Sequence, residues 1–256
     1  MKFSMSPKVD LPGDHNGFQH RHRLHLLGTF ELRMDDRVVD VPASAQRVLA
    51  LVAFQRRPIH RLHLAGLLWP DVPEDRAKAN LRSALWRLNS CTSTVIRRVQ
   101  GQLALSEDTT VDVHQLADRA TRLLHSHEQV TEADLECAGL DVELLPDWYE
   151  EWLVPEREHL RQLRLHALEA LGYRLVELHR LAEAVLVALD AVHADPLRES
   201  AHRLLIEVHL AEGNRSEAVR QQRRYARLLY TELGIAPSPA FEALLPVEPS
   251  ITPMAG

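Results

Sequence analysis

The sequence predicts a mainly α-helical protein with a small β component: an N-terminal winged helix-turn-helix followed by a TPR-like, all-α helical-repeat domain. Three observations predict this fold class. β-Prone runs, three helical runs and a hairpin follow one another over residues 22–107, which is the element order of a winged helix. After Val113 the pattern is helical almost to the end. In that half a short motif recurs after 34 residues, the period of tetratricopeptide repeats.

The first elements follow from turn and helix-end signals. We expect residues 1–22, which carry Pro, Gly, His and Ser without a period, to form a disordered leader. Residues 22–42 contain two short β-prone runs on either side of a turn signal, Asp35-Asp36. A helical run then begins with Ser44 as its cap and is stopped by Pro58, and a second run ends at Pro70. Four apolar side chains of these runs are expected in the core: Leu49, Val52, Leu68 and Trp69.

The third helical run, from about Glu74 to Asn89, is amphipathic and basic. Five apolar side chains fall within about a quarter of its circumference: Ala77, Leu81, Ala84, Leu85 and Leu88. The opposite side is polar and positively charged, so one face is built for a core and the other for a negatively charged partner. The acidic Glu74 and Asp75 lie in the first turn, where the helix dipole favours anions.

A hairpin follows this helix, with two strands around Gly101 in residues 93–107. Arg97 and Arg98 lie in its first strand. Because neighbouring side chains of a strand point to opposite faces, at most one of them is expected to reach a nucleic-acid backbone.

The second half shows an internal repeat. The motif Leu181–Val185 (LAEAV) recurs as Arg215–Val219 (RSEAV), an offset of 34 residues. Two such units plus a preceding helix, residues 155–178, fit the available length. We therefore expect a winged-helix domain over residues 23–118, a repeat domain over residues 119–245 and a flexible tail over residues 246–256.

Charge is distributed unevenly between these two parts. The net charge of −6 hides a value of +3 over residues 20–118, with 14 Lys and Arg against 11 Asp and Glu. Residues 119–256 carry −9, with 14 basic and 23 acidic side chains. A basic domain joined to an acidic one suggests that DNA binds the first and proteins, or a second copy of the chain, bind the second.

The exposed face of the third helix supplies the candidate DNA-binding residues. A guanidinium near its centre, on Arg82, can bond a guanine O6 and N7 in bidentate fashion. The base-reading candidates are Arg76, Arg82, Ser83 and Trp86. The phosphate candidates are Lys78, Asn80, Arg87, Arg97 and Arg98. The competing interpretation is a solvated surface side chain for Arg82, and ordinary solubility or an internal salt bridge for Lys78, Asn80 and Arg87. Trp86 is ambiguous, since it could touch a thymine methyl or be buried against the hairpin, and burial is slightly favoured.

Other function classes find little support. The sequence has no phosphate-binding loop, nucleophile elbow or H-E-x-x-H motif, so we expect no enzyme and no cofactor. His20, His22 and His25 cluster, but no Cys or carboxylate joins them at the spacing of a closed site, so no metal is expected. Two cysteines, Cys91 and Cys137, and no membrane-length apolar run indicate a cytoplasmic protein.

Both halves resemble one known arrangement. Residues 24–118 resemble the OmpR/PhoB-type winged-helix domain, and residues 119–245 resemble the bacterial transcriptional activator domain that follows it in SARP regulators of actinobacteria. The residues that carry the resemblance are Leu27-Gly28 with Phe30, 67–70 (LLWP), 80–88 (NLRSALWRL), 111–113 (VDV), 145–153 (LPDWYEEWL) and 233–239 (LGIAPSP).

The resemblance implies a function that the residues alone do not establish. It implies binding to double-stranded promoter DNA, often at direct repeats, with recruitment of RNA polymerase to activate a specialised-metabolite, antibiotic-type gene cluster. Self-association on DNA would accompany such repeats. The alternative from another class is a TPR-type adaptor whose winged helix mediates protein contacts only, and the basic face of the third helix argues against it.

Overall fold

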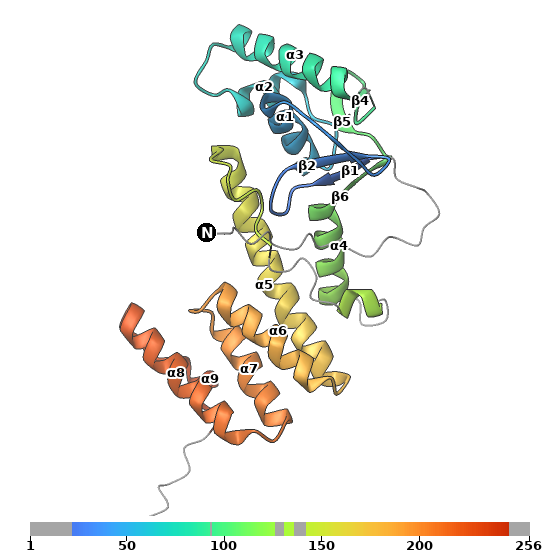
Figure 1. The fold of residues 1–256 in the computed structure, drawn as a ribbon. Helices are drawn as coiled ribbons and strands as arrows, with labels where there is room; N and C mark the ends of the chain where they lie inside the picture. Colours follow the sequence, from blue (N-terminus) through green and yellow to red (C-terminus); the bar gives the residue numbers. More distant parts are fainter. Residues whose placement is uncertain (1–21, 93, 126–130, 136–141, 246–256) are drawn as a thin grey trace, which may run out of the picture. The chain divides into compact units, whose positions relative to one another are not determined.

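The computed structural model describes residues 22–92, 94–125, 131–135 and 142–245, and the chain divides into two compact units (Figure 1). Unit 1 comprises Met1–Arg119 with Val142–Gln162, and unit 2 comprises Ala120–Asp141 with Leu163–Gly256. The mainly helical fold class with small sheets, predicted from the sequence, is confirmed. The predicted leader and tail lie outside the described residues, except that His22 begins the first strand.

A four-stranded sheet, ordered β3-β2-β1-β6, opens unit 1. Its strands are β1 (His22–His25), β2 (Glu31–Met34), β3 (Arg37–Val39) and β6 (Thr109–Val111). Neighbouring strands are antiparallel except for β1 and β6, which are parallel. Asp35 and Asp36 both have positive φ, 44° and 65°, as a two-residue hairpin requires. Three strands form where two β-prone runs were expected, because Gly28, at φ 79°, divides the first run.

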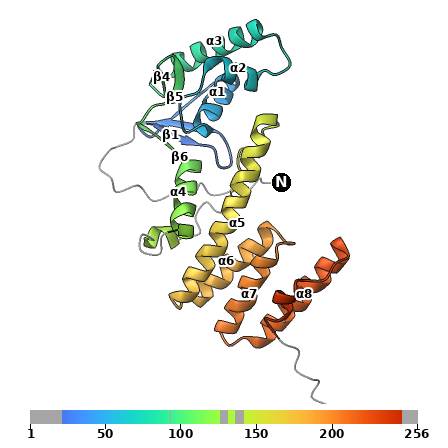
Figure 2. The same cartoon turned by 180° about the vertical axis from the view of Figure 1, so that it is seen from behind.

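Three helices follow the first three strands of unit 1 (Figure 2): α1 (Ala43–Phe54), α2 (Arg61–Leu68) and α3 (Glu74–Cys91). The expectation that Ser44 caps α1 was wrong. The helix starts one residue earlier, because the carbonyl of Pro42 accepts hydrogen bonds from the N–H groups of Ala45 and Gln46. The Ser44 hydroxyl instead accepts a hydrogen bond from Arg87 at 3.1 Å. The helix also ends at Phe54, several residues before Pro58.

The wing is the hairpin of β4 (Ile96–Val99) and β5 (Gln102–Leu105). Gln100 and Gly101 form its two-residue turn, both with positive φ. The chain between α1 and α2 joins this hairpin, since Ile59 and Leu103 exchange backbone hydrogen bonds of 2.8 and 2.9 Å. The order of strands, three helices and a terminal hairpin is that of a winged helix-turn-helix, as predicted.

Residues 142–162 complete unit 1. The N–H of Leu145 donates to the carbonyl of Leu26, and Trp148 stacks on Phe30 with ring centroids 6.0 Å apart. Arg47 joins this segment to the helices, because its guanidinium donates to the carbonyl of Leu68 at 2.9 Å and to the carboxylate of Glu150 at 2.5 Å. These contacts give Leu145, Trp148 and Glu150 of the LPDWYEEWL motif a structural role.

The buried carboxylate of Asp112 ties the start of α4 (Asp112–His125) to the first sheet. It accepts hydrogen bonds of 2.9 to 3.0 Å from the N–H groups of Leu26 and Leu27. Burial nevertheless raises the pKa of this carboxyl group, against the lowering effect of the hydrogen bonds from Leu27 and Leu26. The conspicuous VDV sequence at the end of the wing therefore has a structural role.

Unit 2 consists mainly of stacked helix pairs. Its long helices are α5 (Val154–Glu177), which begins in unit 1, α6 (Leu181–Ala194), α7 (Glu199–Ala211) and α8 (Arg215–Leu233), followed by the short α9 (Pro239–Glu242). The 34-residue period is confirmed, because α6 and α8 begin at residues 181 and 215. The turns repeat too, since His179 and Gly213 both adopt left-handed backbone, at φ 57° and 79°.

Candidate nucleic-acid interface

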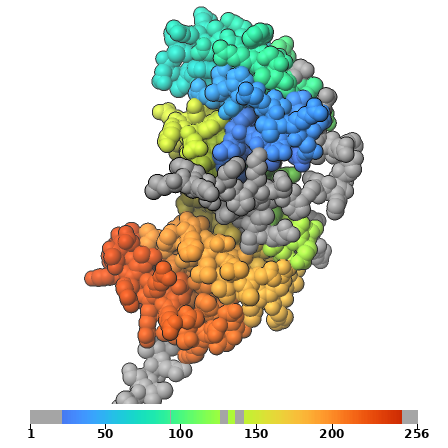
Figure 3. Space-filling model, viewed as in Figure 1, coloured from blue at the N-terminus to red at the C-terminus, as the bar shows by residue number. Residues whose placement is uncertain are grey.

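Helix α3 has the two faces that the sequence predicts. All five predicted apolar side chains are buried, and Ala77, Leu81, Ala84 and Leu85 share a core with α1, α2 and the wing. Burying a leucine side chain contributes roughly 1.5–3 kcal/mol, so this face fixes the rotation of the helix about its axis. The opposite face is thereby fixed toward solvent, and residues around α3 form an outer surface of unit 1 (Figure 3).

The predicted base-reading residues all lie on this exposed face. Arg76, Arg82 and Ser83 are exposed, and among the described residues neither arginine has an ion-pair or hydrogen-bond partner. The indole of Trp86 is 71% exposed, so the slight preference for its burial against the hairpin was wrong. The neighbouring Leu85 occupies the buried position, which leaves Trp86 one turn from Arg82 on the solvent side.

Three arginines from different elements converge on this face. Arg61 is the first residue of α2, Arg82 lies in the middle of α3, and Arg98 lies in β4. Burial lowers the pKa of Arg61, and the charges of Arg98 and Arg82 lower it further, so Arg61 lies near both of these arginines. None of them pairs with a carboxylate among the described residues. Such a cluster is stabilised when an anion occupies it.

The sequence reasoning missed Arg61. It lies at the N-terminus of the first helix of the helix-turn-helix, the end that crosses the DNA backbone in proteins of this fold. That position within the motif was the available signal.

The remaining phosphate candidates are held by neighbours. Lys78 pairs with Glu74 and lies 3.7 Å from Asp75, and the hydrogen bond that its ammonium group donates to Glu74 raises the pKa of Lys78. Arg97 pairs with Glu107 at 2.9 Å. Arg87 donates to Ser44, as described above, and Asn80 is half-buried. Of the two wing arginines, Arg98 is therefore the one available to an incoming anion.

The histidine and cysteine candidates do not form a metal centre in the described part of the chain. No group of three His, Cys, Asp or Glu side chains with metal-binding geometry occurs there. His22 bonds Thr94 at 2.8 Å, and His25 lies 3.7 Å from Asp112. Cys91 is a free, half-buried thiol. His20 and Cys137 lie outside the described residues.

Comparison with known proteins identifies the family. A family model described as the bacterial transcriptional activator domain matches residues 111–245. The chain belongs to this family. The resemblance to SARP-type regulators predicted from the sequence is therefore confirmed, and a family of transcriptional regulators is not an enzyme class.

A solved structure is similar to this chain over more of its length than the family model is. EmbR of Mycobacterium tuberculosis, in complex with a low affinity phosphopeptide, matches 88% of this chain with a TM-score of 0.73 and 22% identity. At that identity the likeness concerns the fold. The match covers 64% of the EmbR chain, so the present chain spans less than two thirds of its length. A search of curated proteins gave no match. None of the helices in the described ranges has the length and apolar character needed to cross a membrane.

Proposed function

We propose that this protein is a sequence-specific DNA-binding transcriptional activator whose α3 enters the major groove. The observation that carries the proposal is the two-faced α3, whose apolar side is buried in the core while Arg76, Arg82 and Trp86 lie exposed on the opposite side. The exposed Arg98 of the wing and the half-buried Arg61 of α2 add positive charge to the same part of unit 1. A polyanion with regularly spaced phosphates and guanine acceptors is the ligand that such a helix-turn-helix face best complements.

Each side chain has a distinct part in this proposal. Arg82 forms the bidentate contact to a guanine, and Arg76 and Ser83 contact neighbouring base edges. The exposed indole of Trp86 packs on a thymine methyl or on the sugar–phosphate wall. The phosphate contacts come from Arg61 and Arg98, and Lys78, Asn80 and Arg87 on the flanks of α3 supplement them. Arg97, which pairs with Glu107, does not take part.

The wider role follows from the family. We infer that the protein acts in the cytoplasm, binds direct repeats in promoter DNA by self-association, and recruits RNA polymerase to an antibiotic-type gene cluster. The acidic charge of residues 119–256 supports this division of labour, because a net charge of −9 repels DNA and leaves that half for protein contacts.

The experiment is selection of bound duplexes from a random DNA pool by the full-length protein at near-physiological salt. We expect enrichment of a motif repeated about 10–10.5 bp apart. The triple variant R61A/R82A/R98A should lose the enrichment. The control R37A removes an exposed arginine on β3 and should retain it. Absence of salt-dependent duplex binding by the wild type would favour the TPR-type adaptor instead.

A further inference from the structure

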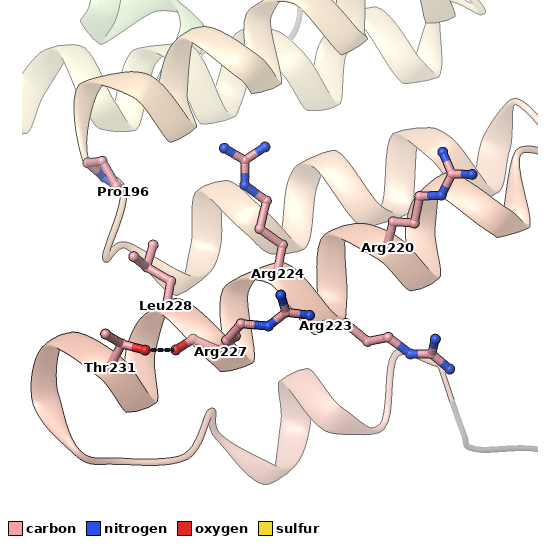
Figure 4. Close-up of a pocket in the computed structure, with 7 residues that line it drawn as sticks. All are labelled: Pro196, Arg220, Arg223, Arg224, Arg227, Leu228 and Thr231. Atoms are coloured by element: carbon pink, nitrogen blue, oxygen red, sulfur yellow. Dashed lines mark hydrogen bonds between the residues drawn. The ribbon is translucent and has the colours of Figure 1, made fainter.

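One helix of the acidic unit 2 carries a dense row of arginines. Arg220, Arg223, Arg224 and Arg227 of α8 are all exposed and occupy two turns of the helix (Figure 4). Arg220 and Arg224 extend in the same direction from α8, whereas Arg223 extends away from them. We call these four residues the α8 arginine face.

The charges of this face are largely uncompensated. Arg220 pairs with Glu217 at 2.8 Å, whereas the other three arginines have no carboxylate partner in the part of the chain that the structure describes. Like charges four residues apart on a helix destabilise it by about 0.2–0.5 kcal/mol per pair. A bound anion would remove that repulsion.

The arginines line a hollow of about 830 Å³ together with Pro196, Leu228 and Thr231. Hydrogen bonds from two side chains fix the backbone at Pro196 and Leu197, which forms one edge of this hollow. The buried His202 bonds the carbonyl of Pro196 at 2.9 Å, and the hydroxyl of Tyr225 donates to the carbonyl of Leu197 at 3.1 Å. The backbone at this edge of the hollow is therefore fixed before any ligand arrives, which lowers the entropic cost of binding.

Exposed apolar side chains follow the arginines toward the C-terminal end of α8 and just beyond it. Tyr230 is 72% exposed, and Leu233 and Ile235 are 54% and 53% exposed. Tyr230 lies one turn beyond Arg227, so the row of cations leads directly into an aromatic and aliphatic patch. Arginine beside tyrosine is the composition of protein-binding surfaces, whereas a phosphate backbone offers nothing to an aliphatic patch.

We propose that the α8 arginine face binds an acidic segment of a partner protein, with an apolar side chain of that segment resting on the neighbouring Tyr230 and Leu233. Guanidinium groups bind carboxylates in bidentate fashion, which gives such a segment both affinity and register. The negative charge of this half opposes a long polyanion such as DNA. A short peptide feels mainly the local field, because charges beyond about 8–10 Å are screened at physiological salt. The inference does not depend on DNA binding by α3.

The test uses the full-length protein and a fluorescein-labelled 12-residue peptide of alternating glutamates and leucines, with a glutamine-for-glutamate peptide as the neutral probe. We expect the acidic peptide to bind with salt-sensitive affinity and the neutral peptide to bind at least about tenfold more weakly. The variant R223E/R227E should weaken binding of the acidic peptide by about tenfold or more, and R223Q/R227Q by less. The matched control R37E/R57E makes the same change in net charge on exposed arginines of unit 1 and should bind as the wild type does.

Four outcomes would overturn the proposal. The wild type could ignore the acidic peptide, or bind the neutral one equally well. The variant R223E/R227E could bind the acidic peptide as the wild type does. It could instead lose duplex DNA binding while R37E/R57E retains it, which would make the face a nucleic-acid surface. A change in sedimentation of R223E/R227E without a change in peptide binding would make it a contact between copies.

Discussion

At the scale of single residues, the side that a helical residue faces was predictable, and its partners were not. The period of 3.6 residues places Leu81 and Leu88 inward and Arg82 outward, as observed. The cluster around Arg82 depends on where α2 begins and how the wing folds back, and no local pattern encodes that distance. The same reason explains the errors at Ser44 and Trp86, because the cap position of α1 is occupied by Pro42 and the hairpin does not cover Trp86.

Replacing Arg82 with alanine tests the central contact of the proposed interface. We expect a loss of about 1–3 kcal/mol in binding to the selected duplex, with relaxed preference at one base pair, because a bidentate contact to guanine is removed. Fluorescence anisotropy on the selected site and on single-base variants measures both effects. The variant R98A should weaken all sequences equally and lower the salt slope by about 1. Equal behaviour of the two variants would contradict the assigned roles.

Two buried histidines make stability depend on pH. Burial lowers the pKa of His202 and of His114 below the ordinary value of 6.5, and the nearby charges of Arg224 and Arg56 respectively add to this effect. The folded protein therefore takes up protons on these two rings at lower pH than the unfolded chain does, which takes them up near pH 6.5. Their contribution to the free energy of unfolding is present above that pH and is lost as the pH falls through the lowered values.

Urea denaturation between pH 8 and pH 5.5 checks this prediction. Wild-type stability should decrease below about pH 6.5. The variant H202Q, whose amide can still donate to the carbonyl of Pro196, should show a shallower decrease. Parallel curves for the two proteins would mean that His202 does not titrate on unfolding.

At the scale of elements, the repeat was the most predictable feature of unit 2. The helices α6 and α8 begin 34 residues apart, as the offset of the motif predicts, and the left-handed residues His179 and Gly213 that precede them are separated by the same number. What could not be predicted is how closely the helices approach. Gly172 of α5 faces Leu204 of α7 at a distance that leaves no room for a methyl group, since a Cβ there would lie 2.5 Å from Leu204 Cδ2.

Two glycine-to-alanine substitutions should therefore have opposite signs. Alanine at Gly172 must displace the fully buried Leu204, and overpacking costs about 1–3 kcal/mol, which exceeds the gain in helix propensity of about 1 kcal/mol. Alanine at Gly66, in the exposed interior of α2 with nothing within 4 Å, should stabilise by roughly 0.5–1 kcal/mol. Thermal denaturation of both variants decides the matter, and stabilisation by G172A would contradict the close approach.

At the scale of the whole molecule, no sequence pattern indicates that residues 142–162 belong with the winged helix. Local periodicity reports the helical character of the segment and says nothing about its pairing with residues far away. The contacts that decide the question are the backbone pairing of Leu26 with Leu145 and the ring stacking of Phe30 on Trp148. Both contacts join positions more than a hundred residues apart, and the periodicity of a short stretch of sequence contains no information about such distant pairs.

Fragments of the chain test this organisation. A fragment of residues 22–162 should melt higher than one of residues 22–119, because the shorter one loses the Trp148 stack and the Arg47–Glu150 ion pair. A loss of about 2–3 kcal/mol corresponds to a decrease of roughly 10–20 °C for a domain of this size. Circular dichroism melting measures the difference. Equal melting temperatures would show that residues 142–162 add nothing to unit 1.

The interleaving of the two units also constrains how such proteins can be recombined. Because unit 1 is built from two separate stretches with Ala120–Asp141 between them, one crossover cannot exchange it whole without also exchanging that segment of unit 2. A chimaera that takes only residues 1–119 inherits an exposed Phe30 and an unpaired Arg47, and depends on the recipient for a compatible LPDWYEEW segment. Exchange of DNA specificity between relatives is therefore expected to spare the framework and to proceed by substitutions on the exposed face of α3.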